Sequence, residues 1–266
     1  MYPQYMQFNL AACHQPISIC NNPKFKPFRN CLGSLDGVFV PVQVPANMQS
    51  NYRSRKGIIA QNVMAAVNFN SEFVFVLAGW EGSAHDTRVF NDAITKGFRI
   101  PGNKYFLADA GYGIRQGLMT PYRGVRYHLK EQASASVRPD NKKELYNLRH
   151  ASLRNVVERI FGCIKKKFPI LANTPEVELN KQVRLIYALC CLWNFIRKHE
   201  TEEMMFEEYT PPEVPNSIKV GVPLNHQTTP SAQDDAHMKS RRDRLASKLW
   251  EQYRNYTSSR AVVDRM

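Results

Sequence analysis

The chain has 266 residues, of which 43% are hydrophobic, and its formal net charge is +13 with a pI near 9.5. This length allows one large domain with appendages, or two small domains. The excess positive charge suggests a polyanionic partner, most often nucleic acid, and a merely basic surface is the plain alternative. No run of about 18 apolar residues occurs and residues 1–10 do not resemble a signal peptide, so neither a membrane span nor a secretory leader is expected.

The six cysteines do not follow the pattern of a zinc site or of a disulfide framework. None forms a C-x-x-C pair, and Cys190 and Cys191 are adjacent within an apolar helical pattern. Reduced, partly buried thiols in an intracellular protein are therefore expected. The histidines lack ligand spacing, and the P-loop, dinucleotide-binding, serine-hydrolase and zinc-protease motifs are absent.

The first part of the chain predicts an extended lead-in followed by a strand. Residues 1–30 contain four prolines and little periodicity, whereas residues 38–42 alternate β-branched valines with other residues. Pro41 indicates a strand end or an edge position. Asp36 precedes Gly37 and is expected where the strand begins or kinks, or in a plain Asp-Gly turn.

A polar, basic loop and a hairpin come next. Residues 43–57 could grip a phosphate backbone or form a solvated turn. The cations gathered in this loop are Arg53, Arg55 and Lys56. Two apolar segments, residues 58–69 and 73–77, flank a short polar turn and predict paired strands.

Two further acids occupy expected junctions between elements. Ser83 lies three residues before Asp86, which suggests a capping-box-like start of a helix. The inner face of this helix is expected to contain Val89, Phe90, Ala93 and Ile94. Asp109 ends a short apolar strand and is followed by glycines, a common setting for a functional group and also for a turn.

Residues 114–150 predict a long, polar and basic insertion in which cations and tyrosines are interleaved. Its cations include Arg123, Arg126, Lys142 and Lys143, and its tyrosines are Tyr122, Tyr127 and Tyr146. Cationic and aromatic side chains together can hold a nucleic-acid backbone and stack on bases.

A helix with an apolar stripe is expected from Leu153 to Phe168, and Glu158 lies at the edge of that stripe. A carboxylate there costs free energy unless a positive group meets it. Arg154, one turn earlier, is one candidate partner. A metal ion held together with distant carboxylates is the other candidate.

The C-terminal third predicts a buried helix, a linker and a final helix. Residues 181–198 are apolar nearly all round. The composition becomes acidic, proline-rich and polar over residues 200–240, which predicts a disordered linker. A basic C-terminal helix is expected within residues 241–266.

The isolated acids to explain are Asp36, Asp86, Asp109 and Glu158. Hard carboxylate oxygens without soft ligands favour Mg²⁺ or Mn²⁺. Two such ions about 4 Å apart can cut a phosphodiester, because one activates the attacking water or 3′-hydroxyl and the other stabilises the leaving oxygen. Spacing alone leaves this chemistry as one hypothesis.

Several sequence blocks resemble the PIF/Harbinger superfamily of DDE transposases and the related host-derived HARBI-type nucleases. The blocks span 31–37, 52–62, 79–86, 105–112 and 148–161, and the resemblance extends from about Pro16 to Lys198. It implies an α/β, RNase H-like domain over residues 31–199, in which helices flank a mixed sheet, with a basic insertion and a C-terminal tail.

The resemblance implies a DDE triad of Asp36, Asp109 and Glu158 that binds Mg²⁺ or Mn²⁺ and cleaves DNA. Asp86 matches a further acid of the family, and is either a fourth metal ligand or a helix-start residue. The cations after Glu158 would face the DNA backbone, namely Arg159, Lys165, Lys166 and Lys167.

Asp36 comes too early for the N-terminal DNA-reading domain that family members usually carry. The resemblance therefore implies a truncated chain, a transposon relic, or dependence on a partner such as a separate Myb-like DNA-binding protein. Nuclear localisation, no membrane association and possible oligomerisation follow from the same reasoning. The alternative function is a catalytically silent, domesticated adapter associated with chromatin.

Overall fold

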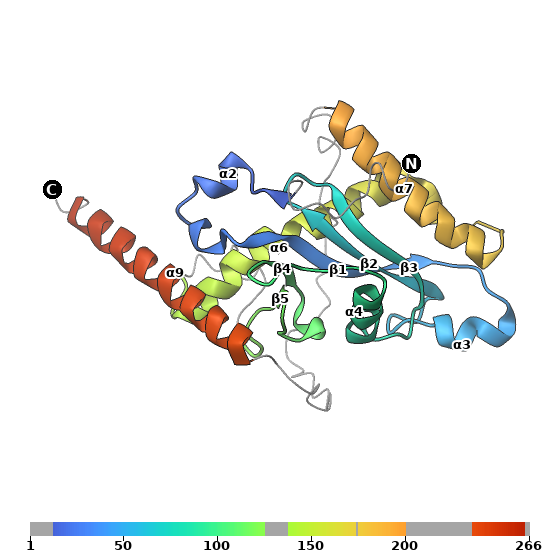
Figure 1. The fold of residues 1–266 in the computed structure, drawn as a ribbon, viewed down its shortest axis with the longest axis horizontal. Helices are drawn as coiled ribbons and strands as arrows, with labels where there is room; N and C mark the ends of the chain where they lie inside the picture. The colour runs from blue at the N-terminus through green and yellow to red at the C-terminus, as the bar shows by residue number, and fades with distance from the viewer. Residues whose placement is uncertain (1–12, 126–137, 174, 201–235, 264–266) are drawn as a thin grey trace.

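The computed structural model describes residues 13–125, 138–173, 175–200 and 236–263 of the chain. Five strands form one mixed sheet in the order β3-β2-β1-β4-β5, with helices on both faces (Figure 1). The strands are β1 (Cys31–Pro41), β2 (Ala60–Asn68), β3 (Phe73–Glu81), β4 (Tyr105–Ala108) and β5 (Leu118–Met119). The helices are α2 (Ile17–Cys20), α3 (Gln49–Tyr52), α4 (Asp86–Thr95), α6 (Lys142–Lys167), α7 (Leu179–His199) and α9 (Ala236–Val263). The α/β, RNase H-like fold predicted from the sequence is confirmed.

Strand β1 lies at the centre of the sheet and changes its mode of pairing from one side to the other. It is antiparallel to β2, which is antiparallel to β3, and it is parallel to β4, which is parallel to β5. The β1–β4 register places Leu35 opposite Ala108. The residues that follow them, Asp36 and Asp109, are therefore neighbours across the sheet.

Both faces of the sheet are covered by apolar layers, as the side chains of β2 show. Val63, Ala65 and Val67 belong to a large cluster that also contains residues of α6, α7 and α9. Met64 and Ala66 belong to a second cluster that contains residues of α4. Because successive side chains of a strand point to opposite faces, α4 covers one face and α6 with α7 covers the other.

Helix α7 is tied to the edge strand β3 by a paired amide contact. The backbone N–H of Phe73 donates to Oδ1 of Asn194 at 2.8 Å, and Nδ2 of Asn194 donates to the Phe73 carbonyl at 2.7 Å. The neighbouring Trp193 is fully buried, and its indole N–H donates to the carbonyl of Ser71 at 2.8 Å. These bonds satisfy backbone groups that an edge strand would otherwise leave unpaired.

Several local predictions are confirmed. The paired strands β2 and β3 enclose the predicted polar turn, β1 ends at Pro41, and α6 ends just before Pro169. All six cysteines are free thiols.

None of the helices in the described parts of the chain is both long enough and apolar enough to cross a membrane.

The start of the domain differs from its prediction. Residues 13–30 contain the short helix α2 and a 3₁₀ turn with a fully buried Phe28, so this part is not an extended lead-in. Strand β1 begins at Cys31, so Asp36 lies in its middle rather than at its start or in a turn. The early half of β1 lacks β-branched residues, and its pairing with β2 and β4 supplies the extended conformation instead.

The prediction of a capping box at the start of α4 is wrong. His85 is the N-cap residue, no side chain forms a cap hydrogen bond, and Asp86 is the first residue of the helix. Val89, Phe90 and Ala93 are buried as predicted, whereas Ile94 is 41% exposed. Asp86 nevertheless lies in the first turn of α4, where a negative charge interacts favourably with the helix dipole.

The predicted insertion over residues 114–150 is only in part irregular. It contains β5, and α6 already begins at Lys142. Tyr122 and Tyr146 are buried in the large apolar cluster, so the prediction that they stack on bases is wrong. Residues 126–137, including Arg126, Tyr127 and Lys130, lie outside the described residues.

The prediction that α7 is buried all round is wrong, because Leu192 and Phe195 are 43% and 42% exposed. The predicted basic C-terminal helix is present as α9, but it begins at Ala236, inside the predicted linker. Its Leu245 and Leu249 pack in the large cluster beside α6, so this part of the helix belongs to the domain (Figure 1). The remainder of that linker, residues 201–235, lies outside the described residues.

We expect α9 to contribute to the stability of the domain. Leu249 is 3% exposed within the large cluster, so Leu249→Ala should lower the free energy of unfolding by about 2–4 kcal/mol. The matched change Leu192→Ala, on the exposed side of α7, should cost less than about 1 kcal/mol. Urea unfolding of both variants measures the difference, and equal losses would show that α9 does not belong to the core.

The buried His150 should make stability depend on pH. Burial lowers its pKa to about 3, and its neutral ring donates from Nε2 to the carbonyl of Met119 at 3.0 Å. The nearby charges are Arg154, Asp109 and Arg242. Because only the unfolded chain binds a proton at this histidine between pH 6.5 and 3, stability falls as the pH falls through that range.

The test compares wild type with His150→Gln, whose amide can still donate to the carbonyl. Between pH 6.5 and 5, the wild type should lose about 2 kcal/mol more unfolding free energy than the variant. Parallel pH profiles for the two proteins would mean that His150 is not held neutral.

Candidate active site

Two of the predicted triad acids lie side by side on parallel strands. Asp36 is in the middle of β1, and Asp109 directly follows β4. Asp109 is held by its own turn, because its Oδ1 accepts the backbone N–H of Gly111 at 3.1 Å. Neighbouring strands lie about 4.8 Å apart, so the backbones of the two residues are close, and the negative charge of Asp109 raises the pKa of Asp36.

Helix α6 brings the third acid to the same face of the sheet. Nη1 of Arg154 donates to Oδ2 of Asp36 at 2.7 Å, and Nη2 donates to Oε1 of Glu158. The backbone of α6 also approaches β1 here, because the hydroxyl of Ser34 donates to the carbonyl of Leu153 at 3.4 Å. The sequence left two positive partners open for Glu158, namely Arg154 and a metal ion. The structure shows the contact with Arg154.

The electrostatics of Asp36 reflect this crowding of acids. Burial raises the pKa of Asp36 to about 6, and the negative charges of Asp109 and Glu158 add to the rise. The guanidinium of Arg154 and the backbone N–H of Gly37 oppose it. The carboxylate at this position is therefore costly to keep charged, and it favours a cation beside it.

Asp86 approaches the same place from the opposite face of the sheet. A methyl group added to Gly37 would lie 3.0 Å from Oδ1 of Asn62 and 3.2 Å from both Oδ1 of Asp86 and Oη of Tyr112. Since Asp36 and Gly37 are successive residues of a strand, their outward directions are opposite. The three oxygens therefore gather on the α4 side, whereas the triad lies on the α6 side.

Tyr112 was not predicted as a site residue, and its hydroxyl is enclosed by acids. The side chain is 1% exposed, and within the described parts of the chain its hydroxyl has no hydrogen-bond partner. Burial raises its pKa well above the usual value, and the charges of Asp86, Asp36 and Asp109 add to this. The family-like block that ends at Tyr112 was the one sequence signal that could have found it.

The predicted DNA-contacting cations form two groups. Lys165 donates to the carbonyl of Phe39 at 3.1 Å and lies near Lys56, and Arg55 lies near Asp86. Of these cations, Arg55 lies near an acid, and Lys165 follows Glu158 by about 10 Å along α6. Arg53 is exposed beside them in sequence and donates to the carbonyl of Gly57 at 3.1 Å.

The second group lies toward the other end of α6. Lys142 donates to the hydroxyl of Ser247 at 3.3 Å, and Lys143 lies 5.5 Å from the ring of Tyr122. At 1.5 Å per residue, Lys142 is about 35 Å from Lys165 along the helix. Not all predicted cations can therefore line one short DNA-binding surface at the acids.

Three other predicted DNA-contacting residues were not included in these two groups. Nη2 of Arg123 donates to the carbonyl of Ala110 at 2.6 Å, directly after Asp109. Nη2 of Arg159 lies 3.5 Å from the hydroxyl of Ser71, and Lys166 is exposed.

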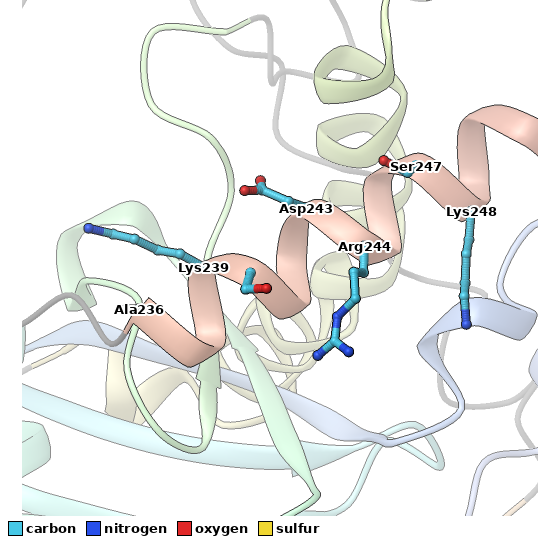
Figure 2. Close-up of a pocket in the computed structure, with 7 residues that line it drawn as sticks. Ala236, Lys239, Asp243, Arg244, Ser247 and Lys248 are labelled. Carbon is cyan, nitrogen blue, oxygen red and sulfur yellow. The ribbon is translucent and has the colours of Figure 1, made fainter.

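A hollow of about 650 Å³ lies along α9 rather than at the acids (Figure 2). Its described lining residues are Ala236, Lys239, Ser240, Asp243, Arg244, Ser247 and Lys248. All of them belong to one helix, and cationic side chains outnumber the single acid. The cations in its lining make this part of the surface positively charged, and none of the described lining residues is a candidate catalytic group.

The mixed sheet with neighbouring aspartates on parallel strands, and a glutamate presented by a long helix, defines an RNase H-like protein of the DDE type. Residues 35–194 match the family described as DDE superfamily endonuclease. This match covers more than half of the chain, which therefore belongs to that family. The DDE relationship predicted from the sequence blocks is confirmed.

The chain is also similar to the Protein ALP1-like of Arabidopsis thaliana, with 24% identity over 200 residues. The similar region is 68% of this chain and 46% of that protein, so the chain spans about half the length of this relative. No solved structure matches the chain.

The type of donor group at these acids suits a hard divalent ion, but the carboxylates are not gathered around one metal position, and an arginine lies between two of them. Carboxylate oxygens of Asp36, Asp109 and Glu158 are the ligand type that Mg²⁺ and Mn²⁺ prefer. Arg154 acts as a stand-in cation between Asp36 and Glu158. In the described parts of the chain, no three histidine, cysteine or acidic side chains are arranged to hold one metal ion.

Because the buried hydroxyl of Tyr112 has no hydrogen-bond partner among the described residues, we expect its removal to stabilise the protein. Tyr112→Phe removes a buried polar group that lacks a bond, so the variant should be more stable by about 1 kcal/mol. The matched change Tyr122→Phe removes a hydroxyl that donates to Oδ1 of Asp243 at 2.5 Å, and it should be less stable by about 1 kcal/mol. Thermal and urea unfolding compare the two, and a destabilised Tyr112→Phe would reveal a bond to this hydroxyl.

Proposed function

We propose that the protein is a metal-dependent DNA endonuclease, derived from a transposase, that cleaves phosphodiester bonds. The observation that carries this proposal is the β1–β4 register, which sets Asp36 beside Asp109 on the face that α6 covers. Glu158 is linked to the same pair through Arg154. Membership of the DDE superfamily endonuclease family supports the same reaction class.

In this proposal, Asp36, Asp109 and Glu158 would hold the divalent ions. Bound Mg²⁺ or Mn²⁺ would supply activation of a water or 3′-hydroxyl and stabilisation of the leaving oxygen. The rigid strands β1 and β4 orient two of the carboxylates, and the turn after Asp109 fixes the second of them. Asp86 remains a prediction as a fourth ligand, on the opposite face from the triad.

Substrate binding in this proposal rests on the cations near the acids. Arg55, Lys56 and Lys165 could contact phosphates on one side, and Arg123 lies beside the residue that follows Asp109. These contacts would position the backbone without reading its sequence. The high net charge of the chain supports a polyanionic substrate.

Nuclear localisation, a Myb-like DNA-binding partner and oligomerisation also remain proposals. A DNA substrate supports the first of them. The partner would supply the sequence recognition that phosphate contacts cannot provide.

A silent adapter of chromatin is the second candidate. The ion pairs of Arg154 favour it, because they neutralise two triad acids without a metal. The presence of all three acids favours the nuclease instead.

Plasmid nicking with Mn²⁺ distinguishes the two functions. Wild type should nick supercoiled DNA, whereas Asp109→Asn and Glu158→Gln should reduce nicking by at least about a hundredfold, because each removes a charged ligand of the ions. Circular dichroism should show an unchanged fold for both variants. The control Glu144→Gln alters a half-buried acid in the first turn of the same helix, about 20 Å along the helix from Glu158, and should nick normally. Undiminished cleavage by Asp109→Asn or Glu158→Gln would remove that residue from the mechanism, and no cleavage by wild type would favour the adapter.

A further inference from the structure

We propose that Arg154 is a positioning residue that competes with the divalent ion for the triad acids. Its guanidinium holds Asp36 and Glu158 together, and it must release at least one of them when a metal binds. This inference rests on the proposed function, because it assigns Arg154 a role at that same site.

The guanidinium contacts the two acids through different nitrogens. Nη1 reaches Asp36 at 2.7 Å, and Nη2 reaches Glu158. The side chain of Arg154 is only 9% exposed, compared with 23% for Asp36 and 49% for Glu158. Arg154 is therefore enclosed between the sheet and α6, where charge-assisted hydrogen bonds are strong.

An ordinary ion pair along a helix would not reach the sheet. Arg154 and Glu158 are four residues apart on α6, which is a common spacing for a helical pair. The additional bond to Asp36 connects α6 to a residue 118 positions away in the sequence. Arg159, one position after Glu158, contacts Ser71 instead, so the link to the acids depends on the position of Arg154 on the helix.

A divalent ion and this guanidinium cannot share the same oxygens without cost. Both are cations drawn to Asp36 and Glu158, and at a separation of a few ångströms they repel one another strongly in a partly buried site. A metal-binding state is then available only in the fraction of molecules in which the arginine has moved. The apparent affinity for metal is lowered by that fraction.

Arg154 also reduces the electrostatic repulsion among the three acids. Three acids placed close together repel one another, and burial already disfavours the charged form of Asp36. The arginine offsets this repulsion through its bonds to Asp36 and Glu158. The same bonds weaken the apparent affinity for the ion, because at least one of them must break when the ion binds.

Calorimetric titration of the metal-free, full-length chain with Mn²⁺ tests the competition. Arg154→Gln removes the guanidinium, and the apparent affinity should rise about tenfold or more, because at least one charge-assisted hydrogen bond no longer has to break. Arg154→Lys retains the charge but loses the two-pronged bridge, so a smaller rise is expected. The control Arg149→Gln removes a positive charge from the same helix and should bind Mn²⁺ as wild type does.

The wild-type protein itself provides a second readout of the competition. The side-chain Nε–Hε signal of Arg154, assigned by its absence in Arg154→Lys, should shift when Mg²⁺ saturates the protein. The same titration should leave the corresponding signal of Arg149 unchanged.

The outcomes separate this inference from the proposed function. Equal Mn²⁺ affinities for wild type, Arg154→Gln and Arg154→Lys, or an unshifted Arg154 signal at saturating Mg²⁺, would overturn the competition while metal binding and nicking still support the nuclease. An absence of metal binding in every folded variant would overturn both.

Discussion

The parallel pairing of β1 with β4 is the constraint on which the candidate site depends. Leu35 and Ala108 are opposite one another, and both are buried in the cluster beneath α4. Their burial fixes which face the next residue of each strand occupies, and so directs Asp36 and Asp109 toward α6. If one of these strands slipped by one residue, its acid would move to the opposite face of the sheet and be buried among apolar groups. Apolar packing on one side of the sheet therefore positions the chemistry on the other.

The electrostatic cost of this arrangement is met by the protein's own side chains. Asp36, Asp109 and Glu158 form a concentration of negative charge that a folded chain tolerates only with positive partners. Arg154 supplies one from the inner face of α6, where its guanidinium bonds two of the acids. The arginine therefore links two of the three acids. In the proposed competition, the strength of this link would determine how readily an ion replaces it, so stability without metal and affinity for metal would be opposed.

Sequence patterns within short segments predicted the strands and helices whose conformation depends on neighbouring residues. The β-branched and aromatic residues of β2 and β3, and the apolar stripe around Glu158, indicated the correct elements, and the family-like blocks indicated the family. Long-range contacts decided the rest. The burial of Leu249 depends on packing against elements far away in the sequence, and the bond between Arg154 and Asp36 depends on how α6 crosses the sheet. Tyr146 has a polar hydroxyl in a basic segment, yet its ring is enclosed in the core, which composition cannot reveal.

The glycine after Asp36 explains why an Asp-Gly pair occurs in the middle of a strand rather than in a turn. Asp36 presents its carboxylate to α6, and Gly37 leaves open the space on the other face that a side chain would fill. Oxygens of Asp86, Asn62 and Tyr112 approach that space to within 3.0–3.2 Å of the position of a methyl group. A larger residue at position 37 would press on the start of α4 and on the turn after Asp109. The small residue thus lets groups from both faces of the sheet approach the same point of β1, and the negative charge of Asp109 influences both Asp36 and Asp86 there.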